Sequence, residues 1–377
     1  MWPTWVRHTV CCLDALGIEG KTNKIATGGY PKFLSQGLNE NYLPVWLQSA
    51  GYNTYYTGKL FNAHTVQNYD SPHAAGFTGS VGRPKVCFNK SGSVLADRTQ
   101  DFLLDPFTYQ YLNSSYQRNK DPPVSHAGEH SVDVLAGKAY GFLEEAVEAE
   151  KPFFLAIAPV APHSNVEITN LEGPVEDIVA NFSPPIPAAR HAHLFKNVKV
   201  PRTENFNPEK PSGANWIRKL ERQSRENIDA NDHFYRNRLR TIQSVDEIVD
   251  GVLTRLEKHG ILDNAYIIFT SDNGYHIGQH RLQPGKECSF EEDINIPLII
   301  RGPGVPEGKT TDLVTTHTDL APTILQLAGA PRRADFDGEA IPLTKSGIKA
   351  ATNHRHEHVN IEYWGFAVGE GDFDKSN

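Results

Sequence analysis

The chain has 377 residues, of which 39% are hydrophobic and 22% charged, and its formal net charge is −8 because 45 acidic residues outnumber 37 Lys and Arg. This composition predicts a folded protein with a large core and excludes a disordered chain. The negative balance argues against nucleic acid as a partner, and no apolar run approaches the roughly 20 residues that a membrane-spanning helix needs.

The first helix–strand pair is predicted between residues 42 and 59. Apolar side chains at helical spacing predict a helix over 42–50, and Gly51 suits the position after a helix end. The aromatic and β-branched run over 52–57 then indicates a strand that ends at Gly58 and Lys59. Lys59 is therefore expected at the carboxyl end of a strand.

A second pair follows. Ser131 suits the N-cap of a helix that reaches about residue 143. The unbroken apolar run over 152–159 is typical of a strand buried on both faces. This strand leads into a loop that contains His163. Residues 166–232 lose the pattern, and we expect them to form a long surface excursion.

The third pair has the clearest pattern. An apolar stripe over 239–256 predicts a long amphipathic helix, and it is followed by a strand over 265–270 and the polar loop 271–274. A further strand over 294–300 and a helix over 319–327 complete the series. Helices that alternate with strands predict an α/β fold, with a mostly parallel central sheet and helices on both faces.

The loop after the third strand has the composition of a cation site. Asp272 and Asn273 offer a carboxylate and an amide oxygen side by side. Ca²⁺ and Mg²⁺ require several oxygen ligands, and this loop supplies two of them. Taken alone, the same residues are equally compatible with an ordinary Asn-Gly turn.

The surrounding sequence favours the cation site. The segment 271–304, which includes Tyr275, His276 and Lys286, resembles a long stretch of the sulfatase family within the alkaline phosphatase superfamily. Three shorter segments resemble the same family in the same order, namely Gly51-Tyr-Asn-Thr-Tyr-Tyr-Thr-Gly-Lys59, Pro159-Val-Ala-Pro-His163 and His317-Thr-Asp-Leu-Ala-Pro-Thr323.

The resemblance covers most of the chain, from about Gly28 to about Pro342. The residues after Lys59 are similar to those of fungal arylsulfatases and N-acetylglucosamine-6-sulfatases, although Phe61 stands where many other sulfatases carry a His. The resemblance implies an alkaline phosphatase-like fold. It also implies a secreted or vacuolar and lysosomal protein, although the first residues of this sequence contain no signal-peptide pattern.

The implied reaction is hydrolysis of a sulfate monoester, a sulfuric ester, on a sulfated small molecule or glycan. Lys59 and Lys286 would be fixed cations over the sulfate oxygens, and His163 would be a hydrogen-bond donor or general acid near the leaving group. His276, beside the cation loop, would either bind the substrate or support the residues that do. A Ca²⁺-type cation held by Asp272 and Asn273 would polarise the sulfate.

The beginning of the chain departs from the family. Sulfatases make their nucleophile, a formylglycine, from the Cys of a Cys-x-Pro-Ser-Arg motif. Cys11 stands at about the right distance before Lys59, but Leu13-Asp14-Ala15 occupies the Pro-Ser-Arg positions, and the family's upstream Asp-Asp pair has no counterpart before Glu40. We therefore expect an impaired nucleophile and cation site, in a chain that is truncated at both ends.

The expected organisation is an anomalous segment over 1–27, a catalytic domain over 28–345 and an incomplete C-terminal subdomain over 346–377. Two other functions remain open. One is hydrolysis of phosphate or phosphonate esters by an enzyme of the same superfamily. The other is a catalytically inactive protein that binds sulfated glycans through Lys59, His163 and Lys286. The sequence leaves the oligomeric state open.

Overall fold

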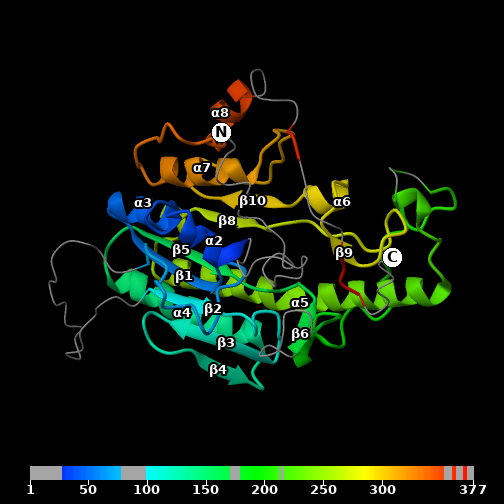
Figure 1. The fold of residues 1–377 in the computed structure, drawn as a ribbon. Helices are drawn as coiled ribbons and strands as arrows, with labels where there is room; N and C mark the ends of the chain where they lie inside the picture. The colour runs from blue at the N-terminus through cyan, green and yellow to red at the C-terminus, as the bar shows by residue number, and fades with distance from the viewer. Residues whose placement is uncertain are drawn as a thin grey trace.

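The computed structural model describes residues 28–77, 99–169, 179–211, 213, 216–351, 359–361 and 368–371. Its centre is a five-stranded sheet in the order β4-β3-β2-β1-β5 (Figure 1). The five strands, in that order, are Val124–Ala127, Asn113–Arg118, Gln100–Leu103, Asn53–Lys59 and Phe153–Ala158. The described residues also form three two-stranded pairs: β8 (Ile267–Thr270) with β10 (Leu298–Arg301), β6 (Asn165–Thr169) with β7 (Val179–Ser183), and β9 (Gly285–Lys286) with β11 (Val368–Gly369).

The helices confirm most of the pattern in the sequence. The helices predicted over 42–50 and over 319–327 are α3 (Leu43–Ser49) and α7 (Leu320–Leu327), and the long amphipathic helix is α5 (Arg225–Lys258). The helix predicted to be capped by Ser131 is α4 (Ser131–Glu148), whose N-cap is His130. Within the part of the chain that the structure describes, no helix is long and apolar enough to cross a membrane. The helices are α2 (Gly29–Ser35), α3 (Leu43–Ser49), α4 (Ser131–Glu148), α5 (Arg225–Lys258), α6 (Glu291–Ile294), α7 (Leu320–Leu327) and α8 (Lys345–Ala351).

Helices cover both faces of the central sheet, as predicted. Successive side chains of a strand point to opposite faces. Tyr55 of β1 belongs to a buried cluster with Phe142 of α4, whereas the next residue, Tyr56, packs against a cluster that contains Tyr30 and Phe33 of α2. Strand β1 is therefore covered on both faces and lies between β2 and β5.

The prediction of a mostly parallel sheet is wrong for the sheet that the structure describes. Strand β1 runs parallel to β2 and to β5, but β2–β3 and β3–β4 are antiparallel pairs. Short connections join β2, β3 and β4, and such connections can only link antiparallel neighbours. The pair β8–β10, which was expected to extend the parallel sheet, is also antiparallel.

Two predicted boundaries also change. Helix α5 begins at Arg225, well before residue 239, because Ser224 and Asn227 form a capping box at its start. The strand predicted over 294–300 is divided: α6 ends at Ile294, and β10 begins at Leu298 after Pro297. The residue before a proline is driven away from helical geometry, which explains the break. The expected surface excursion over 166–232 contains the hairpin β6–β7 and the start of α5.

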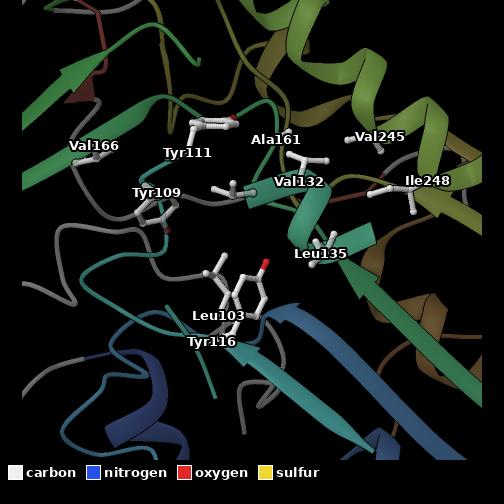
Figure 2. Close-up of a cluster of buried hydrophobic side chains, with 11 residues drawn as sticks. Leu103, Tyr109, Tyr111, Tyr116, Val132, Leu135, Ala161, Val166, Val245 and Ile248 are labelled. Carbon is white, nitrogen blue, oxygen red and sulfur yellow. The ribbon is translucent and has the colours of Figure 1, made fainter. Parts of the chain in front are cut away.

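A buried cluster joins the sheet to the loops at its carboxyl edge. Figure 2 shows Tyr109 and Tyr111, from the segment after β2, among side chains from α4, α5 and the loop after β5. This packing fixes the loop in which His163 lies. The cluster consists of Leu103, Tyr109, Tyr111, Tyr116, Val132, Leu135, Val160, Ala161, Val166, Val245 and Ile248.

Gly58 provides a direct test of the β1–β5 contact. Its φ is +110°, and a Cβ atom there would lie 2.0 Å from the carbonyl oxygen of Ala158. We predict that Gly58→Ala lowers the free energy of unfolding by about 2 kcal/mol or more, since both the backbone and the neighbouring strand resist the methyl group. Gly137 of α4 is the matched control: a methyl group there would meet no neighbouring atom within 4 Å, and Gly137→Ala should stabilise the helix by up to about 1 kcal/mol. Urea unfolding of both variants measures the difference, and equal effects would contradict the close approach.

Candidate anion-binding site

Lys59 ends β1, and His163 lies in the loop after β5, the parallel neighbour of β1. The register pairs Gly58 of β1 with Ala158 of β5, so the residues after both strands meet at one edge of the sheet. The backbone N–H of His163 donates to Val160, and the Tyr111 hydroxyl donates to the His163 carbonyl at 2.9 Å. These bonds hold the loop after β5 against the core.

Tyr109 connects the two predicted residues. Its ring stacks on the His163 imidazole, with 4.1 Å between the ring centroids. The Lys59 ammonium donates to the Tyr109 hydroxyl and lies 4.3 Å from the centre of the same ring. A cation over an aromatic face is attracted by the ring's negative face. Tyr109 therefore brings Lys59 and His163 into one cluster.

Lys286 contacts His163, although the two residues are 123 positions apart in the sequence. Its Nζ lies 2.9 Å from His163 Nε2, and the other ring nitrogen, Nδ1, lies 2.9 Å from the carbonyl oxygen of Ser164. A carbonyl only accepts, so Nδ1 carries a proton, and the neutral ring offers its Nε2 lone pair to the Lys286 ammonium. The structure thus brings the predicted residues Lys59, His163 and Lys286 together.

A carboxylate that the sequence reasoning missed completes the cluster. Glu370 is 4% exposed, and its Oε1 lies 2.9 Å from Lys286 Nζ and 3.9 Å from His163 Nε2. Its Oε2 accepts hydrogen bonds of 3.1 Å from the Ser164 and Tyr275 hydroxyls. Both oxygens of the carboxylate are therefore matched by a cation or a donor.

The carboxyl group of Glu370 is held in its ionised form. Burial raises the pKa of this carboxyl, but the Lys286 ammonium and the hydrogen bonds from Lys286 and Ser164 lower it, and the resulting pKa is about 2. The strand pair β9–β11 brings the two charged residues together, since Lys286 ends β9 and Glu370 directly follows β11. The position beside Lys286 is therefore occupied by an ionised carboxylate of the chain itself.

Asp272 and Asn273 lie in the loop after β8, as predicted. This loop rests on α6: Gly274 N–H donates to the Asp293 carbonyl at 2.8 Å, and a Cβ on Gly274 would lie 2.1 Å from the Glu292 carbonyl oxygen. Within the described residues, no group of three His, Cys, Asp or Glu ligands includes Asp272. Ca²⁺ takes six to eight oxygen ligands, so the described side chains form only part of such a site.

His276 has the position of a supporting group. It is 2% exposed, and its Nδ1 lies 2.9 and 3.0 Å from the two carboxylate oxygens of Asp293. Its backbone pairs in both directions with Gly285, the residue before Lys286. His276 therefore supports the segment that carries Lys286. Cys11, the expected nucleophile, lies outside the described residues.

Phe61 has a structural role, and two residues of the cluster, Tyr109 and Glu370, were not predicted from the sequence. Phe61, at the position where many sulfatases carry a His, packs on Phe33 with 4.6 Å between ring centroids and so belongs to the core. Tyr109 escaped notice because it lies in a segment without helix or strand periodicity. Glu370 escaped notice because residues 346–377 resembled only the beginning of an incomplete subdomain.

Comparison with known proteins identifies the family. Residues 22–330 match the profile named Sulfatase. The chain belongs to the sulfatase family. Sulfatase ppz1 of Metarhizium majus is 44% identical over 64% of this chain and 54% of its own length. An arylsulfatase of Volvox carteri is 36% identical over 97% of this chain and 54% of its own length, and the N-acetylglucosamine-6-sulfatase of Bos taurus is 31% identical over 86% and 52%.

This sulfatase-family chain spans about half the length of these curated relatives. Among solved structures, a protein in complex with its substrate D-glucosamine-2-N,6-O-disulfate has a TM-score of 0.56 at 23% identity, over 79% of this chain and 63% of that protein. This likeness confirms that the described residues have the α/β fold of the family's solved structures.

The Glu370 ion pair predicts a specific dependence of stability on pH. The folded-state pKa is about 2, below the ordinary value of 4.5, so the ionised carboxylate stabilises the fold above pH 4.5, and this stabilisation is lost as the pH falls toward 2. We predict that Glu370→Gln is less stable than the parent at neutral pH, by about 3 kcal/mol, because Lys286 is left buried without its counter-ion. The difference should shrink on acidification.

Chemical denaturation between pH 7 and pH 2 measures this effect. Glu257→Gln, on the exposed face of α5, is the control and should follow the parent at every pH. A constant difference between Glu370→Gln and the parent across this range would show that the carboxylate of Glu370 titrates normally.

Proposed function

We propose that Lys59, His163 and Lys286 bind the sulfate group of a sulfate monoester, and that the chain is part of an arylsulfatase-like hydrolase of such esters. The observation that carries this proposal is that Lys59 contacts Tyr109, Tyr109 stacks on His163, and Lys286 contacts His163, so that two ammonium groups and an imidazole form one connected cluster. A sulfate monoester spreads its negative charge over several oxygens. Fixed cations stabilise that charge strongly in a site with little water.

Each of the three residues has its own role in the proposed reaction. Lys59 and Lys286 neutralise the sulfate oxygens and the charge that develops on the bridging oxygen when the S–O bond breaks. Lys286 Nζ donates to His163 Nε2, and we assign His163 to pass this proton on to the leaving oxygen, so that Nε2 accepts a proton from Lys286 before it donates one. The bond from Nδ1 to the Ser164 carbonyl keeps the ring oriented during that transfer.

Asp272 and Asn273 are the side chains that we assign to a Ca²⁺-type cation, which polarises sulfate oxygens when it is bound. The nucleophile assigned by the resemblance is the formylglycine derived from Cys11. Because Leu13-Asp14-Ala15 replaces Pro-Ser-Arg after it, we propose that this chain binds sulfate but hydrolyses its ester poorly. The catalytic domain is assigned to 28–345, between the segments 1–27 and 346–377.

Glu370 is the intramolecular competitor of the substrate in this proposal. Its carboxylate takes the place beside Lys286 and His163 that the sulfate needs. An entering sulfate must therefore exchange with Glu370, which costs the ion pair and its two hydrogen bonds. The substrate itself is assigned as an aryl sulfate or a sulfated sugar, and the protein as secreted or vacuolar and lysosomal, since its relatives include arylsulfatases, N-acetylglucosamine-6-sulfatases and extracellular sulfatases.

Binding of inorganic sulfate tests the proposal without requiring turnover. Titration calorimetry should detect sulfate binding by the parent chain, and Lys286→Ala should weaken it at least about tenfold, since a hydrogen bond to a charged group contributes about 1.5–3 kcal/mol. Lys210→Ala removes an exposed lysine and should leave the affinity unchanged. Equal affinities for all three proteins would overturn the site.

The same titration tests the competition. Glu370→Gln keeps the shape of the side chain and removes its charge, so it should bind sulfate more tightly than the parent. Weaker binding would show that Glu370 supports the anion instead of excluding it.

Turnover of a chromogenic aryl sulfate, phosphate and phosphonate by the parent then separates a sulfatase from a phosphoester or phosphonate hydrolase. Binding without any turnover identifies a sulfate-binding protein.

A further inference from the structure

A second cluster of potential ligand side chains lies next to the segment that carries Lys286 and is not used in sulfate binding. Potential ligand atoms of His276, Cys288 and Asp293 all lie within 4.8 Å of one another. The three residues come from separate segments: the stretch after the loop 271–274, the residues after β9, and α6. Among the residues that the structure describes, this is the one group of three His, Cys, Asp or Glu side chains whose ligand atoms lie close enough together to hold a metal ion.

The burial of these side chains distinguishes the cluster from an ordinary surface group. The side chains of His276 and Asp293 are 3% and 2% exposed, and Cys288 is partly buried. Cys288 N–H points to Asp293 Oδ1 at 3.5 Å, the same oxygen that lies 2.9 Å from His276 Nδ1. A carboxylate, an imidazole and a thiol therefore surround one small volume.

We propose that His276, Cys288 and Asp293 bind a zinc-type divalent cation. Zinc forms bonds of about 2.0 Å to nitrogen and oxygen and about 2.3 Å to sulfur, so its tetrahedral ligand atoms lie about 3.3 to 3.6 Å apart. The present separations, 2.9 Å between nitrogen and oxygen and up to 4.8 Å overall, require only small adjustments. The thiol excludes Ca²⁺ and Mg²⁺ as the preferred ion, since these cations take oxygen ligands.

The charges of the cluster agree with a bound dication. Burial, followed by the negative charges of Asp293 and Glu287, raises the pKa of the Cys288 thiol to about 12, so without a metal the sulfur keeps its proton. On binding, the cation forms a bond to sulfur, and the thiol proton leaves to solvent. A thiolate and a carboxylate then balance the two positive charges, the neutral imidazole adds a third ligand, and a fourth position remains for water.

A cation here would fasten the segment that carries Lys286. Lys286 lies two residues before Cys288, and its neighbour Gly285 is bonded to His276 through the backbone. The site is separate from the loop of Asp272 and Asn273 in both residues and ligand type. It does not depend on sulfate binding, so it can fail or succeed independently of the proposed function.

Cobalt substitution tests the proposal directly. The parent for this experiment carries Cys11→Ser, Cys12→Ser and Cys87→Ser, so that Cys288 is its sole thiol. After treatment with a chelator, titration with Co²⁺ should produce a thiolate-to-cobalt charge-transfer band that saturates at one equivalent and disappears when Zn²⁺ is added. Absence of that band in the folded sole-thiol protein would overturn the site.

Two variants locate the ion. Cys288→Ser in the same background should abolish the band and weaken zinc binding by more than about 100-fold, because loss of even an outer partner of a ligand costs about 10- to 100-fold. Glu257→Gln, on the exposed face of α5, is the control and should keep both the band and the zinc affinity. If zinc affinity in Cys288→Ser stays within a few-fold of the parent, the thiol is not a ligand.

A thiol-reactivity assay keeps the test decisive if Cys288→Ser fails to fold. In the sole-thiol protein, reaction of Cys288 with an aromatic disulfide reagent is followed with and without one equivalent of Zn²⁺. Coordination should protect the sulfur and slow its modification at least about tenfold, because the zinc-bound thiolate is held in place. An unchanged rate of modification would contradict the proposal.

Discussion

The ammonium group of Lys286 is the constraint on which the site depends. Its side chain is 10% exposed, and a cation deprived of water must recover its solvation from paired charges and hydrogen-bonding groups. Glu370 and His163 provide that compensation at 2.9 Å each. The loop after β5 and the strand pair β9–β11 are thereby joined, although the residues are far apart in the sequence.

The rest of the fold brings those partners to one place. Parallel pairing of β1 with β5 aligns the ends of both strands, and this places Lys59 near the loop of His163. Tyr109 contacts both side chains and is itself part of the buried cluster in Figure 2. The geometry of the anion site is therefore fixed by the same apolar packing that stabilises the sheet.

The sequence predicted those parts of the site that follow local rules. Lys59 ends one run of strand character and His163 lies in the loop after another, and the long stripe of α5 identified that helix. The polar strand β3, Asn113–Arg118, has no apolar alternation, so the antiparallel half of the sheet was missed. Glu370 could not be predicted because its role arises only from its contact with Lys286, which lies 84 positions earlier. The role of His276 was left open because nothing in its neighbourhood revealed the buried partner Asp293.

The central claim is that Lys59, His163 and Lys286 form one anion site that Glu370 fills in the absence of ligand. A crystal structure of the chain soaked with selenate, a sulfate analogue that can be located by its anomalous scattering, tests this claim most directly. We predict a selenium peak beside Lys286 and His163, with the Glu370 carboxylate displaced from Lys286 Nζ. A selenium peak elsewhere, with the Lys286–Glu370 pair intact, would contradict the account.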